Sequence, residues 1–198
     1  MMKTFELWFL RKAAVLCLWF RREAMAVRYW RRILALDPGN DAEHAKVIAS
    51  IAHAQAALGH PGEAVSLLHR SLEIDPAQPG NWFNLGYLLQ QAGAEEDAVA
   101  AFAQALALDA KLDRAWYGQA LSLIALGRVD EAVAALKRTT ELQPLSPYGW
   151  YQLAHAYLRL DRRDEAESVI RRIAKFEPKV AQQLERETGI PSGVNLPF

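Results

Sequence analysis

The sequence predicts an all-α protein, an α-solenoid of antiparallel helical hairpins, because several residue types recur with one period. Tryptophan returns every 34 residues, at Trp82, Trp116 and Trp150. Alanine keeps the same spacing in a second column, at Ala64, Ala98, Ala132 and Ala166. A fixed period of this size is the signature of a repeat array. The composition, with 52% hydrophobic residues, is that of a folded chain.

The other repeating columns have the properties that a helix, a turn and a second helix require. The first helix of each unit is expected to end where the backbone is left-handed, at Gly59, Gly93, Gly127 and Asp161. An acid then opens each second helix, where the helix dipole favours negative charge, at Glu63, Asp97, Glu131 and Glu165. The tryptophans are expected to fill the space between the paired helices.

One unit carries a fuller pattern, with Trp82, Leu85, Gly86, Leu89, Ala98, Phe102 and Ala105. This pattern and its period resemble the tetratricopeptide repeat family. The resemblance implies a right-handed superhelix with repeat frames at 45–78, 79–112, 113–146 and 147–180. It specifies no partner, because the residues that define the family build the scaffold.

Residues 1–44 are expected to form a degenerate fifth repeat, within 7–40. Pro38 precedes Pro76 by 38 residues, four more than the period. Asn40 and Glu43 have the spacing of an N-cap and its capping-box partner, so the extra residues are expected to lengthen the next helix by about one turn. A single long helix over 5–36 is the alternative, since Arg21 stands where three of the four other units have glycine.

The N-terminal segment is also predicted to form a second docking surface, made of Trp8, Arg11, Lys12, Trp19 and Trp30. The three tryptophans are 11 residues apart, which would place them near one face of a single helix. Aromatic residues beside basic ones suit a partner protein, a second copy of the chain or a lipid headgroup layer. Ordinary packing against the first repeat is the alternative.

The location of the protein is predicted from the same segment. Its apolar run over 13–20 is too short to span a membrane, which takes about 20 residues. Cys17, the single cysteine, excludes an intrachain disulfide and fits a reducing compartment, so we expect a cytoplasmic protein. Membrane association, or export through a signal within 1–26, is the alternative. Frequent alanine and arginine favour a bacterial source.

The resemblance further implies that the first helix of each unit lines a concave groove that contacts a ligand. The implied contact positions hold Lys46, His53, Phe83, Asn84, Tyr87, Gln90, Gln91, Arg114, Tyr117, Tyr148, Tyr151, Gln152, His155 and Arg159. Tyrosines and amides suit an extended peptide or a helix, because rings give contact area at small entropic cost. Ala49, His53 and Gly118 depart from the family's clamp for chaperone tails, so a receptor for such tails is not expected.

No pattern in the sequence points to catalysis, to a metal or to a cofactor. The five histidines show no pair with the spacing of metal ligands. The sequence lacks a phosphate-binding loop, a dinucleotide fingerprint and a nucleophile elbow. The net charge of zero gives no general attraction to nucleic acid. We therefore expect no enzyme, no metal, no cofactor and no nucleic-acid partner.

The C-terminal residues 178–188 are predicted to form a capping helix that ends at Gly189 and covers the last repeat with Val180 and Leu184. Residues 181–198 thus comprise the end of this helix and an extended tail. Three outcomes are open for the tail after residue 189: disorder, folding back on the convex face, or binding in the groove of another copy.

The function predicted from these patterns is that of a non-enzymatic scaffold or adaptor, which binds a segment of a partner protein in its groove. An assembly factor docked to a membrane or a larger complex through the N-terminal helices is the alternative. Self-association through the N-terminal segment or the tail is a further possibility.

Overall fold

The computed structural model describes residues 2–39 and 41–194, and it confirms the all-α fold class. The described residues form eleven helices and no strand. The chain divides into two compact units, Met1–Ala92 and Gly93–Phe198, which are described here one at a time. Within the described part of the chain, no helix is both long and apolar enough to cross a membrane.

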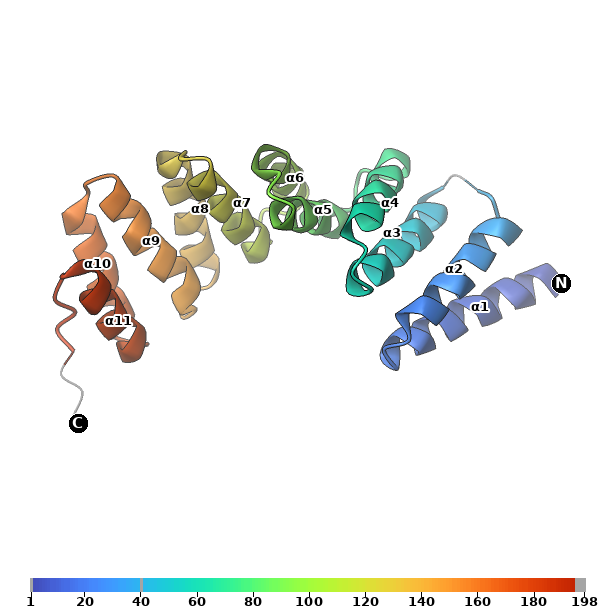
Figure 1. Ribbon diagram of the computed structural model, residues 1–198, viewed down its shortest axis with the longest axis horizontal. Coiled ribbons are helices and arrows are strands. Elements are labelled where there is room, and N and C mark those ends of the chain that lie inside the picture. The colour runs from blue at the N-terminus through green and yellow to red at the C-terminus, as the bar shows by residue number, and fades with distance from the viewer. Residues whose placement is uncertain (1, 40, 195–198) are drawn as a thin grey trace. The chain divides into compact units, whose positions relative to one another are not determined.

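The N-terminal unit is built from five helices that pack in chain order, each against the one before it (Figure 1). They are α1 (Met2–Trp19), α2 (Glu23–Leu36), α3 (Ala42–Ala57), α4 (Pro61–Ile74) and α5 (Pro79–Gln91). One core joins the first three helices through Leu10, Ala14, Val27, Trp30, Ile33, Val47 and Ile51. Helix α2 is therefore enclosed between α1 and α3.

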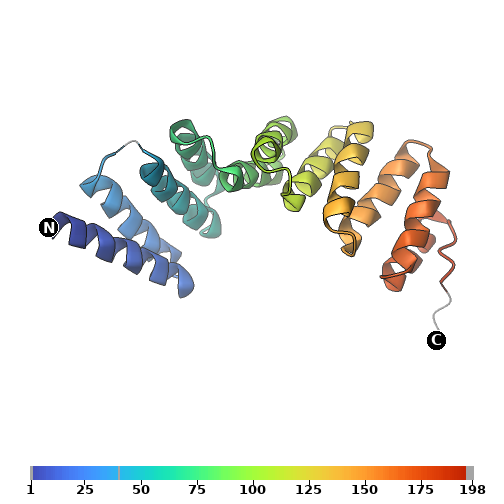
Figure 2. The ribbon, with the colours of Figure 1, turned by 180° about the vertical axis from the view of Figure 1, so that it is seen from behind.

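The C-terminal unit contains six helices, which also pack in chain order (Figure 2). They are α6 (Glu95–Leu108), α7 (Asp113–Ala125), α8 (Val129–Leu142), α9 (Pro147–Arg159), α10 (Arg163–Ala174) and α11 (Pro178–Thr188). Helix α11 contacts both α10 and α9. It therefore lies beside α9, the first helix of the preceding hairpin, as a further first helix would.

The turns between paired helices have the left-handed residue that the sequence predicts. Gly59 and Gly127 have φ angles of 82° and 75°, and Asp161 has a φ of 57°. The N-terminal segment has the same turn, because Arg21 has a φ of 53° and the Arg22 N–H donates to the Cys17 carbonyl at 2.8 Å. Residues 5–36 are thus a hairpin, and the alternative of a single long helix is wrong.

Helix α3 is longer than the first helices that follow it, as the extra residues before it predict. It has 16 residues, whereas α5, α7 and α9 have 13 each. Its N-cap is Asp41, whose carboxylate accepts a hydrogen bond from the His44 N–H at 2.9 Å. The predicted N-cap, Asn40, lies outside the described residues.

The recurring tryptophans are half-buried rather than enclosed between paired helices. Each indole Nε1 donates to the carbonyl six residues earlier, in the turn that precedes its helix. The acceptors are Pro76 for Trp82 at 2.9 Å, Ala110 for Trp116 at 3.0 Å and Pro144 for Trp150 at 3.1 Å. The tryptophan therefore ties each first helix to the chain entering it.

The C-terminal residues fold back onto their own unit. Helix α11 ends at Gly189, which has a φ of 67°, and Ile190 is then buried. The Glu185 carboxylate accepts hydrogen bonds from the Ser192 N–H at 3.1 Å and the Ser192 hydroxyl at 2.6 Å. The tail is thus ordered as far as Val194, and the open predictions for residues 195–198 lie outside the described residues.

Replacing Arg21 with glycine is expected to stabilise the N-terminal hairpin by up to about 1 kcal/mol, because a left-handed residue with a Cβ atom is strained by roughly that amount. Thermal denaturation of the two proteins measures the effect. As a matched control, Arg28→Gly introduces glycine within α2 and should destabilise by about 1 kcal/mol. A loss of stability in Arg21→Gly would contradict the assignment of the turn.

Gly118→Ala is expected to destabilise the C-terminal unit by about 1–3 kcal/mol through overpacking. A Cβ atom at Gly118 would lie 2.6 Å from Cζ of Phe102, whose side chain is fully buried and has no room to move. Gly80→Ala is the control, because a Cβ atom there meets nothing within 4 Å. Equal melting temperatures for the Gly118→Ala variant and the parent would contradict this packing.

Candidate functional site

In the N-terminal unit, the predicted groove residues lie on α3 and α5. Lys46 is exposed and forms an ion pair with Glu43 at 2.7 Å. About two turns further along α3, His53 contacts α5. The side-chain amide nitrogen of Asn84 lies 2.7 Å from Nε2 of His53. Burial lowers the pKa of His53, so the ring is neutral near pH 7 and its Nε2 accepts from the amide.

The other four predicted residues of this unit are distributed along α5. Phe83 and Gln90 are half-buried, whereas Tyr87 and Gln91 are exposed. Tyr87 leaves 50% of its surface accessible. The unit therefore offers one exposed aromatic ring among amides on its last helix.

In the C-terminal unit, the side chains of Tyr117 on α7 and Gln152 on α9 lie near one another. Burial raises the pKa of Tyr117, and the nearby Gln152 amide opposes that rise. The hydroxyl is therefore protonated at neutral pH. This pair places side chains of two consecutive first helices next to one another.

A second polar cluster connects α9 to α11 through the carboxylate of Glu187. The Tyr151 hydroxyl donates to Glu187 Oε2 at 2.8 Å, and His155 Nε2 lies 3.1 Å from the same oxygen. The Gln183 amide donates to the other oxygen, Oε1, at 2.8 Å. The rings of Tyr151 and His155 pack edge to face, with centroids 4.7 Å apart.

These hydrogen bonds change the acidity of both partners. The bonds from Gln183 and Tyr151 stabilise the charged carboxylate and lower the pKa of Glu187. The same bond raises the pKa of Tyr151, because ionising the phenol would place two negative charges together. The cluster thus holds a fixed carboxylate beside a neutral tyrosine.

An open, mostly apolar hollow of about 280 Å³ lies next to this cluster, between α9 and α11. It is lined by Pro147, Tyr148, Tyr151, Val180 and Gln183. Tyr148 leaves 71% of its surface exposed at the edge. The hollow has the size to take one side chain, with a tyrosine on each of two successive turns of α9 and an amide opposite.

Arg114 and Arg159, the other predicted groove residues of this unit, are exposed on α7 and in the last turn of α9. The sequence prediction missed Gln183 and Glu187, because it treated α11 only as a cap. One signal pointed to them. Helix α11 opens with Pro178, which occupies the proline column, so its exposed residues take the place of a further first helix.

The structure exposes three of the five residues predicted for a second docking surface, and their binding to a partner stays a prediction. Trp8 and Trp19 of α1 are 56% and 84% exposed, and Lys12 is exposed between them. Arg11 forms an ion pair with Glu43 at 3.3 Å. Trp30 is buried in the core of the N-terminal unit, because the hairpin turn breaks the 11-residue spacing that a single helix would have kept.

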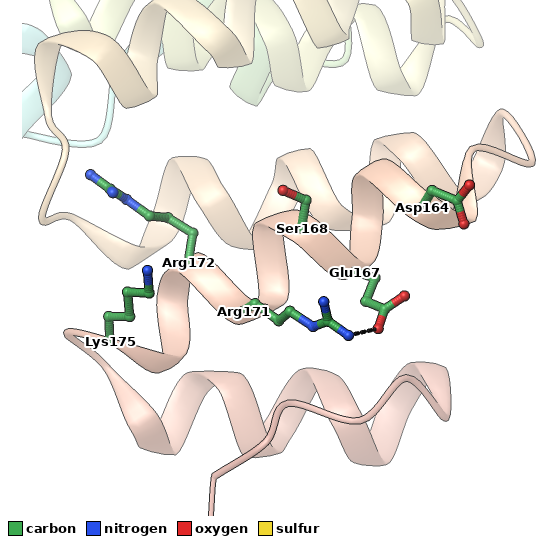
Figure 3. Close-up of a pocket in the computed structure, with 6 residues that line it drawn as sticks. All are labelled: Asp164, Glu167, Ser168, Arg171, Arg172 and Lys175. Carbon is green, nitrogen blue, oxygen red and sulfur yellow. Dashed lines mark hydrogen bonds and ion pairs between the residues drawn. The ribbon is translucent and has the colours of Figure 1, made fainter.

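A polar hollow of about 290 Å³ lies along α10 (Figure 3) and is lined by Asp164, Glu167, Ser168, Arg171, Arg172 and Lys175. Five of these residues belong to α10, and Lys175 is its C-cap. Arg171 and Glu167 are paired, and Arg172 lies over the Trp150 ring at 5.9 Å. This is the charged outer face of α10, and its cations lie where the helix dipole favours them.

The hairpins and their exposed first-helix residues define a helical repeat protein of the scaffold class. Two models of the tetratricopeptide repeat match the sequence, one at residues 50–113 and the other at 89–151 and 123–186. Together they run from residue 50 to 186, well over half of the 198 residues. The chain therefore belongs to the tetratricopeptide repeat family, whose members are protein-interaction scaffolds. No curated protein matches the sequence significantly.

Solved structures with a similar fold include MamA, at 21% identity and a TM-score of 0.77, covering 85% of this chain and 96% of that one. MamA from Desulfovibrio magneticus RS-1, from residue 41 to its end, has 21% identity and a TM-score of 0.75, with 92% and 97% covered. YrrB, described as having an unusual peptide-binding site, has 18% identity and a TM-score of 0.76, with 87% and 88% covered. At these identities the likeness concerns the fold alone.

The Glu187→Gln variant, an isostere of the protonated acid, is expected to lower the melting temperature at about pH 7 and to lower it less at about pH 3. The folded-state pKa of Glu187 is lowered, so its contacts stabilise the protein above the unfolded pKa and are lost as pH falls through the folded value. Thermal denaturation at both pH values tests this. A difference of the same size at both would contradict the role of the carboxylate.

Proposed function

We propose that the protein is a scaffold that binds an extended segment of a partner protein on the first-helix face of its C-terminal unit, formed by α7, α9 and α11. The observation that carries the proposal is the apolar hollow between α9 and α11, with tyrosines at its edge and a fixed carboxylate beside it. Grooves that bind peptides do so through pockets for single side chains, with hydrogen-bonding groups beside these pockets.

The chemistry of this face restricts the segment that it would bind. The hollow is mostly apolar, so it would take an aliphatic or aromatic side chain. The hydroxyl of Tyr117 and the amide of Gln152 would form hydrogen bonds with backbone groups of the peptide. Glu187 keeps its charge at neutral pH and favours a lysine or arginine nearby in the segment.

Two features make the face suitable for binding without a large rearrangement. The bonds from Tyr151, His155 and Gln183 to Glu187 hold the side chains of α9 and α11 in place before a ligand arrives. Tyrosine loses little conformational entropy when it makes contacts, since it has two rotatable bonds. Preorganisation of this kind improves affinity by reducing the cost of ordering the site.

To test the proposal, peptides are selected from a random library on the full chain, and the affinity of the selected peptides is measured by titration calorimetry. We expect Tyr148→Ala with Tyr151→Ala to weaken binding at least about tenfold, because each ring of a well-packed contact contributes about 1–2 kcal/mol. The matched control is Tyr87→Ala, an exposed first-helix tyrosine of the other unit.

Loss of binding in the double variant with normal binding in Tyr87→Ala supports the proposed site. Equal affinity in the double variant and the parent would contradict it, as would a library that yields no specific peptide. The single variant Tyr148→Ala is measured as well, because its ring is 71% exposed and its loss is expected to change the melting temperature by no more than a few degrees. Weaker peptide binding in this variant separates loss of contact from loss of fold.

A further inference from the structure

Helix α1, the first helix of its unit, has apolar residues on two opposite sides. One side packs on α2 through Leu10 and Ala14, which are buried. The opposite side leaves a row of large apolar residues exposed over its whole length: Phe5, Trp8, Phe9, Val15, Leu16, Trp19 and, in the turn, Phe20. A contiguous apolar face of this kind on a helix is usually covered by a partner or a membrane in its working state. We call this row the α1 outer face.

The α1 outer face is also hollowed. A depression of about 770 Å³ runs along it, lined almost entirely by apolar atoms of α1 together with Tyr29 of α2. Trp19 is 84% exposed and Leu16 is 57% exposed at its rim. The volume of this hollow is larger than one side chain would fill. Hydrocarbon chains can occupy such a groove, because they need no hydrogen-bond partners.

The charges around the α1 outer face are positive. Lys12 is exposed on the face, near the middle of the row, and Arg21 and Arg22 are exposed in the turn at its end. No acid lies in the row, and the nearest one on α1, Glu6, is paired with Arg32 at 3.3 Å. A face with tryptophans, phenylalanines and flanking cations matches the interface of an anionic bilayer.

We propose that the α1 outer face docks the protein on the surface of an anionic membrane, with α1 lying in the plane of the headgroups. The helix would not cross the bilayer. Phe5 to Phe20 spans about 22 Å at 1.5 Å per residue, a strip long enough to insert its rings side by side. The Lys12 stem would follow the apolar surface while its ammonium reaches lipid phosphates.

A second copy of the chain fits this face less well than a membrane. In a symmetric dimer the same patch meets itself, and antiparallel pairing of the row places its middle against its middle. Lys12 would then face Lys12 of the other copy, and no carboxylate of the row could compensate the repulsion.

The test is co-sedimentation of the full chain with vesicles of phosphatidylcholine containing about a third phosphatidylglycerol, and with vesicles of phosphatidylcholine alone. We expect binding to the anionic vesicles that weakens with added salt. Leu16→Ser with Trp19→Ser should reduce the partition coefficient at least about tenfold, since two exposed apolar side chains are removed. The melting temperature should stay unchanged.

Two matched controls accompany this variant. Leu145→Ser with Tyr148→Ser removes a leucine and a ring that are 73% and 71% exposed on the other unit, and should leave vesicle binding unchanged. Lys12→Glu should weaken binding to anionic vesicles alone, whereas Lys111→Glu, another exposed lysine, should have a much smaller effect.

Equal sedimentation with and without vesicles would overturn the proposal. So would binding that Leu16→Ser with Trp19→Ser leaves intact. A third contradicting result is concentration-dependent dimerisation in sedimentation velocity that the same double variant abolishes while vesicles bind nothing, because the face would then be an interface between copies.

Discussion

A helical hairpin of this family buries only part of its apolar surface by itself, and the rest of the structure follows from that constraint. Within each of the two units, every helix packs against its neighbours in the chain, and in a repeat array only nearest neighbours contribute. The turn residue closes the hairpin, and the tryptophan ties it to the chain that enters it through a hydrogen bond of about 3 Å. The ends of such a stack remain the places where cover is lacking.

The chain treats its two ends differently. At the C-terminal end, α11 and residues 190–194 cover the last hairpin, with Leu184 and Ile190 fully buried. At the N-terminal end, α1 covers α2 but leaves its own outer face apolar. We connect this asymmetry to function. The C-terminal end has the hollow and the carboxylate that we propose for a peptide, and the N-terminal end has the face that we propose for a membrane.

The fold could be predicted almost completely from the sequence because repeat contacts are local and periodic. The positions of Gly59, Gly127 and Asp161 alone specify where helices end. Arg21 was harder to interpret, since only the hydrogen-bond closure from Arg22 to Cys17 shows that arginine has taken the place of glycine. The burial of Trp30 follows from that turn.

The candidate site could be predicted only in part. Tyr117, Tyr151 and His155 were found from their positions in the repeat. Glu187, the partner of Tyr151 and His155, was not, because it lies 36 residues from Tyr151 on a helix that ends the repeat pattern. The repeat period also does not predict how much of each side chain is exposed.

The most direct test of the account is to map one selected peptide on the protein by NMR, with ring and amide resonances of the C-terminal unit assigned. The account predicts that the largest shift changes occur at Tyr148, Tyr151 and Gln183, which line the hollow between α9 and α11. Changes concentrated on the outer face of α10, at Arg171, Arg172 and Lys175, would contradict it.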